Sequence, residues 1–357
     1  MKFLIYSVLL GTLLLAEPIS PLPTVDNLTL KEKVAVPFDM ETYKGLWKER
    51  IGLLKAQGIV PLIDVESTFN PKTFDPLDYA KMMDRYGVAL IAFSAHVLGF
   101  EKNKKVWNDT ARLIMKVDPY RYVPTTVAGI HPVWPGAPLE FVKKTIAKAE
   151  SDNYPLLGEF EFRHYPSPRQ VERNEFFRDV TIPIESEAAH LLFAFSQRTG
   201  KSFQIHYEAE DELFAPLEKM LTSYPGAKVI WCHLGQIRYS NRTKLYTPAY
   251  IKTLLERHPN LYFDLAFGAS DSVYKPSGEY HATLWQGRGN SLNSKWKALI
   301  EAYPYRFLMA FDIGGDRHDE LPKKVDVARD ILKNFSLPTQ EIIAYKAFWK
   351  LVFNELL

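Results

Sequence analysis

The chain has 357 residues, enough for one large domain or two of ordinary size. Hydrophobic residues make up 46% of it and charged residues 24%, which is ordinary for a globular protein with a large core. A formal charge of +2 without a basic tract gives no reason to expect a nucleic acid or an acidic surface as partner. We therefore expect a small-molecule partner and leave the oligomeric state open.

The N-terminus has the pattern of a secretory signal peptide. Lys2 is followed by an apolar run that ends at Ala16, too short for a comfortable membrane span. We predict a signal peptide over residues 1–16, a Pro-rich lead-in over 17–45, no stable membrane insertion and a periplasmic or secreted protein. An uncleaved anchor and a cytoplasmic protein are the alternatives. The single cysteine, Cys232, excludes an internal disulfide.

Beyond the lead-in, short apolar runs alternate with stretches whose apolar residues recur every three or four positions. The apolar runs predict eight strands, at 59–68, 88–96, 122–131, 156–164, 202–209, 228–236, 261–268 and 307–315. The other stretches predict helices at 40–57, 77–86, 103–117, 139–152, 185–199, 215–223, 248–257 and 294–302, and two more after Leu321, the last at 339–353. This order predicts an α/β fold, a single-domain (β/α)8 TIM barrel over 46–357 with extra C-terminal helices. No glycine-rich loop follows a strand, which disfavours an open doubly wound sheet.

Acids and histidines gather at the ends of these strands. Because side chains alternate along a strand, Glu159, Glu161 and Arg163 share one face, opposite Phe160 and Phe162. The same alternation predicts that Cys232 faces the surrounding helices. The residues predicted to face the barrel mouth are Asp64, Glu66, Thr68, Ser94, His96, His131, Glu159, Glu161, Arg163, His206, Glu208, His233, Asp264 and Asp312. So many titratable groups at one mouth favour metal binding or acid–base catalysis over packing.

Two long segments, 164–183 and 267–289, follow strands and are predicted to be extended loops on the catalytic face. The first contains Arg169, Arg173 and Arg178. We expect these arginines to be solvated, with contact to an anionic substrate as the alternative.

Three strand-end motifs carry a family resemblance: QIHYEAE at strand five, CHLG at strand six and AFDIGG at strand eight. In these motifs the chain resembles the amidohydrolase superfamily, most closely the amidohydrolase-related branch that includes decarboxylases and lactonases acting on small carboxylates. The closing helix, EIIAYKAFWKLV, is similar to the family's final helix, and the resemblance follows strand order over residues 59–353. It implies that His206 is a metal ligand, that His233 is a ligand or an acid–base group, and that Asp312 holds and deprotonates the attacking water.

The chain departs from the family at strand one, where the family has a His-x-His pair of metal ligands. Glu66 and Thr68 stand at those positions. Glutamate can ligate zinc or manganese through oxygen, whereas threonine is a poor ligand for either. We predict one divalent metal, zinc or manganese, with absence of any metal as the alternative. The predicted ligands are Glu66, His206, Glu159 and Asp312.

These features together predict an exported, amidohydrolase-like hydrolase. It would cleave a C–N or C–O bond, in an amide or a lactone, of a small molecule by attack of an activated water. The predicted catalytic residues are Asp312, His233 and Arg163, and the predicted substrate-binding residues are His131, His96, Glu161 and Glu208. Two alternatives stay open: a degenerate, metal-free barrel that binds a small ligand, and a metal-independent lactonase.

Overall fold

The structure is a computed structural model that describes residues 36–69, 73–95, 110–234, 236–266, 268–280, 284–287, 289–315 and 317–357. The predicted signal peptide, most of the lead-in and His96 lie outside the described residues. Within the described ranges, no helix combines the length and the apolar character that a membrane span needs.

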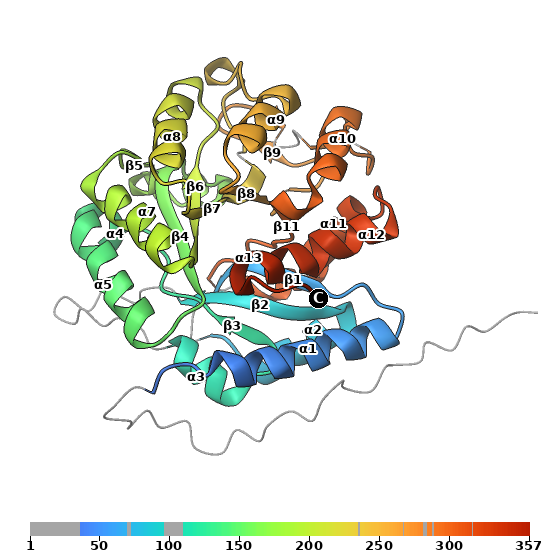
Figure 1. Cartoon of the computed structure of the whole chain (residues 1–357). Coiled ribbons are helices and arrows are strands. Elements are labelled where there is room, and N and C mark those ends of the chain that lie inside the picture. Colours follow the sequence, from blue (N-terminus) through green and yellow to red (C-terminus); the bar gives the residue numbers. More distant parts are fainter. Residues whose placement is uncertain are drawn as a thin grey trace, which may run out of the picture.

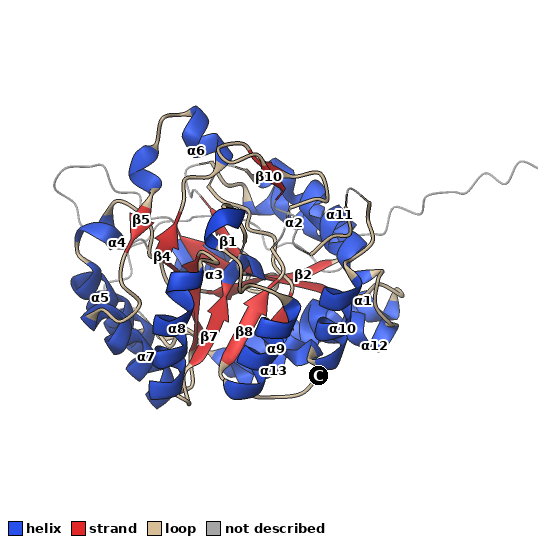
Figure 2. Ribbon diagram, turned by 90° about the horizontal axis from the view of Figure 1, so that it is seen from above, coloured by secondary structure: helices blue, strands red, loops and turns tan. Residues whose placement is uncertain are grey.

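Eight parallel strands form the centre of the molecule (Figures 1 and 2). They are β1 (Leu62–Phe69), β2 (Val88–Ala95), β3 (Tyr122–Pro124), β4 (Leu156–His164), β6 (Ser202–Tyr207), β7 (Lys228–Trp231), β8 (Leu261–Asp264) and β11 (Phe307–Leu308). Strands β1–β2–β3 form one sheet, and β11–β8–β7–β6–β4 form another, with the short β5 (Val180–Thr181) antiparallel at its edge.

The two sheets join into a closed ring. One parallel bridge links Thr125, after β3, with Leu156 of β4, and another links Ser67 of β1 with Ile313, after β11. Each strand therefore has a parallel neighbour on both sides, which confirms the predicted eight-stranded barrel.

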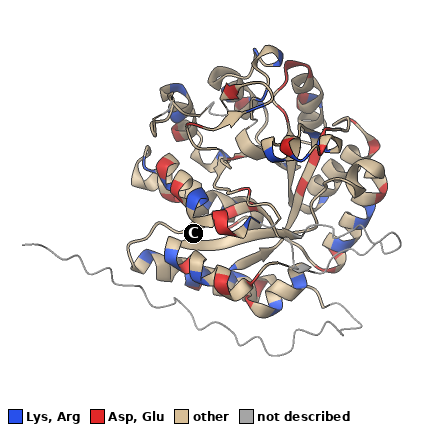
Figure 3. Cartoon of the chain, turned by 180° about the vertical axis from the view of Figure 1, so that it is seen from behind, with Lys and Arg blue, Asp and Glu red and all other residues tan. Residues whose placement is uncertain are grey.

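Helices surround the strands, and all eight predicted strands and the helices between them are present. Besides α6, described below, the α-helices are α1 (Met40–Ala56), α2 (Pro76–Tyr86), α3 (Thr110–Val117), α4 (Val133–Gly136), α5 (Pro138–Ser151), α7 (Glu187–Thr199), α8 (Asp211–Ser223), α9 (Pro248–Arg257), α10 (Ser294–Ala302), α11 (Leu321–Leu332), α12 (Leu337–Glu341) and α13 (Ala347–Phe353). The turn η6 (Ile342–Lys346) joins α12 to α13, so the predicted final helix is one continuous run with a π-helical centre. Figure 3 shows basic and acidic residues mixed over these outer helices, in keeping with the small net charge.

Local sequence signals explain where several helices begin and end. Asp75 accepts hydrogen bonds from the backbone N–H groups of Leu77 and Asp78 at the start of α2, next to Pro76 in the first turn. Gly87 ends the same helix in the left-handed conformation, which costs glycine little.

The layer between strands and helices is apolar and confirms the alternation read from the sequence. The rings of Phe160 and Phe162 each lie 5.3 Å from Trp134, under α5. Trp231 of β7 stacks on Phe263 of β8 at 5.5 Å in the same layer. The opposite faces of β4 and β7 are therefore left to line the barrel.

Asp64 closes the seam between the first and last strands. It is fully buried, and its Oδ1 accepts hydrogen bonds from the backbone N–H groups of Phe311 at 2.9 Å and Glu66 at 3.0 Å. Ser67 donates its hydroxyl to the other oxygen of the same carboxylate. This carboxylate therefore holds the backbone of β1 against the segment that follows β11.

The two long segments at the mouth contain more structure than predicted. The first holds α6 (Pro168–Glu172), the turn η1 (Phe176–Arg178) and β5, and the second holds the hairpin of β9 (Val273–Tyr274) and β10 (Glu279–Tyr280). The prediction of extended loops was wrong here because short-range capping and pairing with β4 order the first segment.

Candidate metal centre at the barrel mouth

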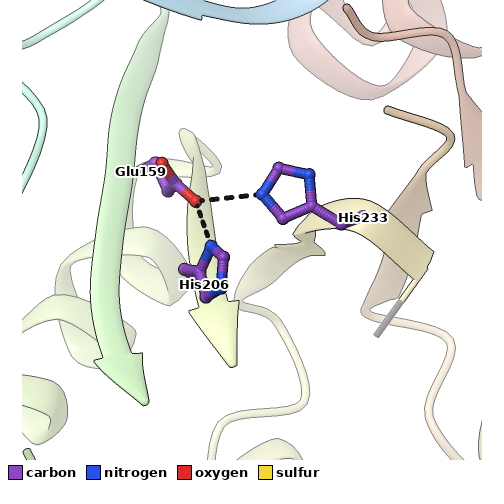
Figure 4. A group of neighbouring side chains, drawn as sticks. All are labelled: Glu159, His206 and His233. Atoms are coloured by element: carbon purple, nitrogen blue, oxygen red, sulfur yellow. Dashed lines mark hydrogen bonds and ion pairs between the residues drawn. The ribbon is translucent and has the colours of Figure 1, made fainter. Parts of the chain in front are cut away.

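Three side chains from successive strands of the barrel meet at its mouth (Figure 4). Glu159 comes from β4, His206 from β6 and His233 from the turn that follows β7. Each is buried, and each offers a ligand atom within 4.8 Å of the others. Oε1 of Glu159 lies 2.9 Å from Nδ1 of His206 and 3.5 Å from Nε2 of His233.

The backbone after β7 turns His233 into this group. Strand β7 ends at Trp231, and His233 adopts a left-handed conformation with φ 61°. Oδ1 of Asp264 holds that turn by accepting hydrogen bonds from the backbone N–H groups of His233 at 2.8 Å and Ala266 at 3.0 Å. The unusual backbone angle is thus supported by a buried carboxylate from the neighbouring strand.

A backbone carbonyl sets the orientation of the His233 ring. Its Nδ1 lies 3.3 Å from the carbonyl oxygen of Ala266, which assigns the ring proton to Nδ1. Nε2 then faces Glu66 and Glu159, each at 3.5 Å. A histidine whose second nitrogen is held by a carbonyl is typical of metal ligands.

The prediction that Cys232 faces the helices was wrong. Its sulfur lies within 4.8 Å of carboxylate oxygens of Glu66 and Asp264, inside the barrel. The last strand residue, Trp231, faces outward, so alternation brings Cys232 inward, and the left-handed turn then returns His233 to the same side. Two consecutive residues therefore face the mouth.

The centre carries strongly shifted charges. Burial favours neutral His206, but hydrogen bonds to Glu159 at 2.9 Å and Glu208 at 3.2 Å outweigh it and raise the pKa of His206 to about 9. Burial likewise opposes the ionised form of Glu159, yet the two histidines hold the pKa of this carboxyl well below its usual range. Burial and the nearby Glu159 raise the pKa of Glu66 well above its usual range. The group is therefore one anionic carboxylate between the imidazolium of His206 and the ring of His233, beside the neutral carboxyl of Glu66.

Two of the residues predicted to bind substrate lie next to the three-residue group and are tied to arginines. Glu161 forms an ion pair with Arg178 of η1, and burial raises its pKa to about 7. Arg178 is mostly buried, so the expectation that it is solvated was wrong. Glu208 accepts a hydrogen bond from the backbone N–H of Tyr165 at 3.1 Å and lies 3.5 Å from Nε of Arg238.

Other predicted site residues lie at the rim. Arg163 forms ion pairs with Asp179 at 2.6 Å and Glu210 at 3.5 Å, not with the three-residue group. Asp312 exposes 41% of its side chain, and its backbone N–H donates to the carbonyl oxygen of Glu66 at 3.0 Å. The ring of His131 lies 4.6 Å from that of Phe177.

The four predicted metal ligands are thus divided. Glu159 and His206 lie together with His233, whereas Glu66 groups with Cys232 and Asp264. Asp312 lies at the rim, outside both groups.

Three basic residues near the centre did not emerge from the sequence. The ring of His164, which ends β4, lies 4.5 Å from that of His206, and the register of β4 against β6 shifts just before it, between Glu161 and Arg163. Arg238 reaches the site from the segment after β7. Lys324 of α11 is placed near Asp312 and Glu320 by the closure of the barrel, and burial lowers its pKa. Only the long-range fold gives these positions, so no local motif could have indicated them.

No family model matches this sequence, and no curated protein sequence matches it. Among solved structures, the chain is similar to a 4-oxalomesaconate hydratase from Rhodopseudomonas palustris, with 11% identity, 82% of this chain and 95% of that chain covered, and a TM-score of 0.51. A dihydroxybenzoic acid decarboxylase from Polaromonas, solved with manganese and an inhibitor, is 10% identical and covers 83% of this chain and 98% of its own, with a TM-score of 0.49. An amidohydrolase from Burkholderia multivorans is 10% identical over 82% of this chain and 99% of its own, with a TM-score of 0.46.

At this level of identity the likeness to the hydratase shows a common fold. The resemblance predicted from the strand-end motifs is therefore confirmed at the level of the fold.

Proposed function

We propose that this protein is an enzyme of the amidohydrolase kind that binds one divalent cation between Glu159, His206 and His233. It would cleave an amide or lactone bond of a small molecule. The observation that carries the proposal is the convergence of these three buried ligands, with Nε2 of His233 aimed at the carboxylate.

The donor set suits such a cation. Two imidazole nitrogens and one carboxylate leave a coordination position open for water or substrate, as catalytic zinc sites do, and manganese accepts the same donors. Because His206 is protonated in the metal-free centre, a cation would have to displace that proton. When bound, the cation would polarise the scissile carbonyl and lower the pKa of a water molecule.

Residues around the three-residue group would handle protons and substrate. Asp312 is exposed enough to accept the proton of the attacking water, and Arg317 lies 3.7 Å from its carboxylate and orients it. His131, Glu161 and Glu208 remain our candidates for substrate contact. Arg163 would act through its ion pair with Asp179, as a positioning residue for the segment that covers β4.

The second candidate function, a metal-free lactonase or ligand-binding barrel, has an observation of its own. The negative charge of Glu159 is already balanced by His206 and His233 without a cation. Glu66, with its raised pKa, could then act as a general acid.

Metal analysis of protein purified without added metal, and again after incubation with zinc or manganese, separates the two functions. We expect bound manganese in the wild type. Glu159→Gln and His206→Ala should lose both the manganese and the hydrolysis of a panel of amides and lactones. The matched control is Glu150→Gln, an exposed glutamate that pairs with Arg198 at 2.7 Å. Lactone hydrolysis by metal-free protein would favour the second candidate, and absence of hydrolysis by metal-loaded protein would count against the first.

We also propose that the protein is exported, because residues 1–16 have the pattern of a signal peptide. The mass of the mature protein tests this: loss of these residues is expected, and retention of Met1 on intracellular protein would contradict it.

A further inference from the structure

A second group of ligand-type side chains lies deeper than the first. Glu66 of β1, Cys232 after β7 and Asp264 at the end of β8 offer ligand atoms within 4.8 Å of one another. Their exposed fractions are 4%, 1% and 0%. Three different strands thus direct a thiol and two carboxyl groups at one buried point.

Several oxygens of this group have no hydrogen-bond partner among the described residues. Both carboxyl oxygens of Glu66 and Oδ2 of Asp264 are in this state. Oδ1 of Asp264 is used to hold the turn at His233, so Oδ2 is the oxygen left to face Glu66 and Cys232. The nearest ring nitrogen, Nε2 of His233, lies 3.5 Å from Glu66 and makes no hydrogen bond to it, so a proton or a cation between the two carboxyl groups would complete the group.

The chemistry of the donors favours a cation over a proton alone. If the two carboxyl groups only share a proton, a neighbouring thiol contributes little stabilisation. A thiolate together with oxygen ligands, by contrast, is a donor set that binds zinc, cobalt or cadmium. Cation binding would therefore release the thiol proton to solvent.

The second group adjoins the first. Nε2 of His233 lies 3.5 Å from Glu66 and 3.5 Å from Glu159, so one imidazole stands between the two carboxyl groups. Cations bound at the two groups would therefore both lie close to Glu66 and His233.

We propose that Glu66, Cys232 and Asp264 form a second divalent-cation site, selective for thiophilic metals and adjacent to the group of Glu159, His206 and His233. This inference does not require the first group to be catalytic. It adds a specific ligand, the thiolate of the only cysteine in the chain.

Cobalt chloride titration of the metal-free protein tests the site, because a thiolate bound to cobalt(II) gives a near-ultraviolet charge-transfer band. With one cysteine in the chain, such a band can arise only from Cys232. We expect two equivalents of cobalt and the band in the wild type. Cys232→Ala should bind one equivalent without the band, whereas His206→Ala should keep the band while losing the other equivalent.

Cys232→Ser, which keeps the size of the side chain, is the second variant if Cys232→Ala does not fold. It should lose the band and retain a native near-ultraviolet circular dichroism spectrum. One equivalent without a band, lost in His206→Ala, would overturn the second site and leave the proposed function standing. No cobalt binding at all would overturn both, and a band that survives in Cys232→Ser would contradict the assignment of the ligand.

Discussion

At the scale of single residues, His206 decides the charge of the candidate metal centre. Its two nitrogens face two different carboxylates, Glu159 and Glu208, so the ring is held as an imidazolium despite burial. When a cation replaces the proton on Nδ1, the contact between Nε2 and Glu208 would still hold the ring in place. Proton and cation therefore compete for one imidazole.

This competition predicts a pH dependence of stability in metal-free protein. The pKa of His206 is raised from 6.5 to about 9, so its stabilisation is complete below about pH 6.5 and is lost as pH rises through about 9. We expect the urea unfolding free energy to fall between these values, and an NMR titration of the ring to show the raised pKa. The exposed His190 is the internal control, and a pKa of His206 near 6.5 would contradict the network.

Asp64 gives a second prediction at this scale. Asn in its place can accept through only one oxygen, so either the backbone bonds or the Ser67 bond is lost. We expect Asp64→Asn to lower the unfolding free energy by about 2 kcal/mol at pH 8. Asp78→Asn, an exposed change, should alter it by less than about 0.5 kcal/mol. Equal losses of unfolding free energy in the two variants, measured by urea denaturation, would show that Asp64 does not stabilise the contact between the first and last strands.

At the scale of elements, the segment between β4 and α7 is held against the mouth by β4 itself. Residue Thr181 of β5 pairs with Arg163 of β4, and Arg178 of η1 forms an ion pair with the buried Glu161. The candidate site is thus bordered by an ordered segment that contains α6, η1 and β5, and not by an extended loop.

Replacing Arg178 in this segment should lower the unfolding free energy by an amount that depends on pH. In Arg178→Ala the carboxylate of Glu161 would stay buried without its partner, unless it takes up a proton, which its pKa of about 7 makes easy below neutrality. We expect a loss of about 2 kcal/mol in unfolding free energy at pH 8 and a smaller loss at pH 6. Arg173→Ala, in the exposed part of the same segment, is the matched control. A loss independent of pH would show that Glu161 is not the partner that matters.

The elements also show how far the sequence could predict the site. Hydrophobic alternation correctly separates Phe160 and Phe162 from Glu159, because successive side chains of a strand point to opposite faces. Alternation counted back from His233 misplaces Cys232, because His233 adopts a left-handed backbone conformation two residues after the strand ends. Such a turn depends on Asp264 from the next strand, a contact that no local pattern contains.

At the scale of the whole molecule, closure of the barrel brings the site together. The bridge between Ser67 and Ile313 joins strands separated by most of the chain, and places Glu66 beside the turn that carries Asp312. Alternation of eight strands and helices was sufficient to predict this architecture. The positions of Arg238 and Lys324 were not predictable, because they depend on how the segment after β7 and helix α11 pack near the mouth.

Because the ligands meet only in the closed barrel, cation binding should stabilise the whole fold. At a free cation concentration of one hundred times Kd we expect about 2.7 kcal/mol of added stability, seen as a rise in Tm. With manganese, which a site containing a thiolate disfavours, His206→Ala should abolish this rise, and Glu150→Gln should keep it. A rise of equal size in His206→Ala would show that the cation binds elsewhere.

The central claim is that Glu159, His206 and His233 together hold a divalent cation. Anomalous diffraction from a crystal soaked in zinc or manganese, recorded on both sides of the metal's absorption edge, tests it most directly. We predict a peak within coordination distance of one carboxylate oxygen and both imidazoles. A saturated crystal without a peak between these three side chains would contradict the account.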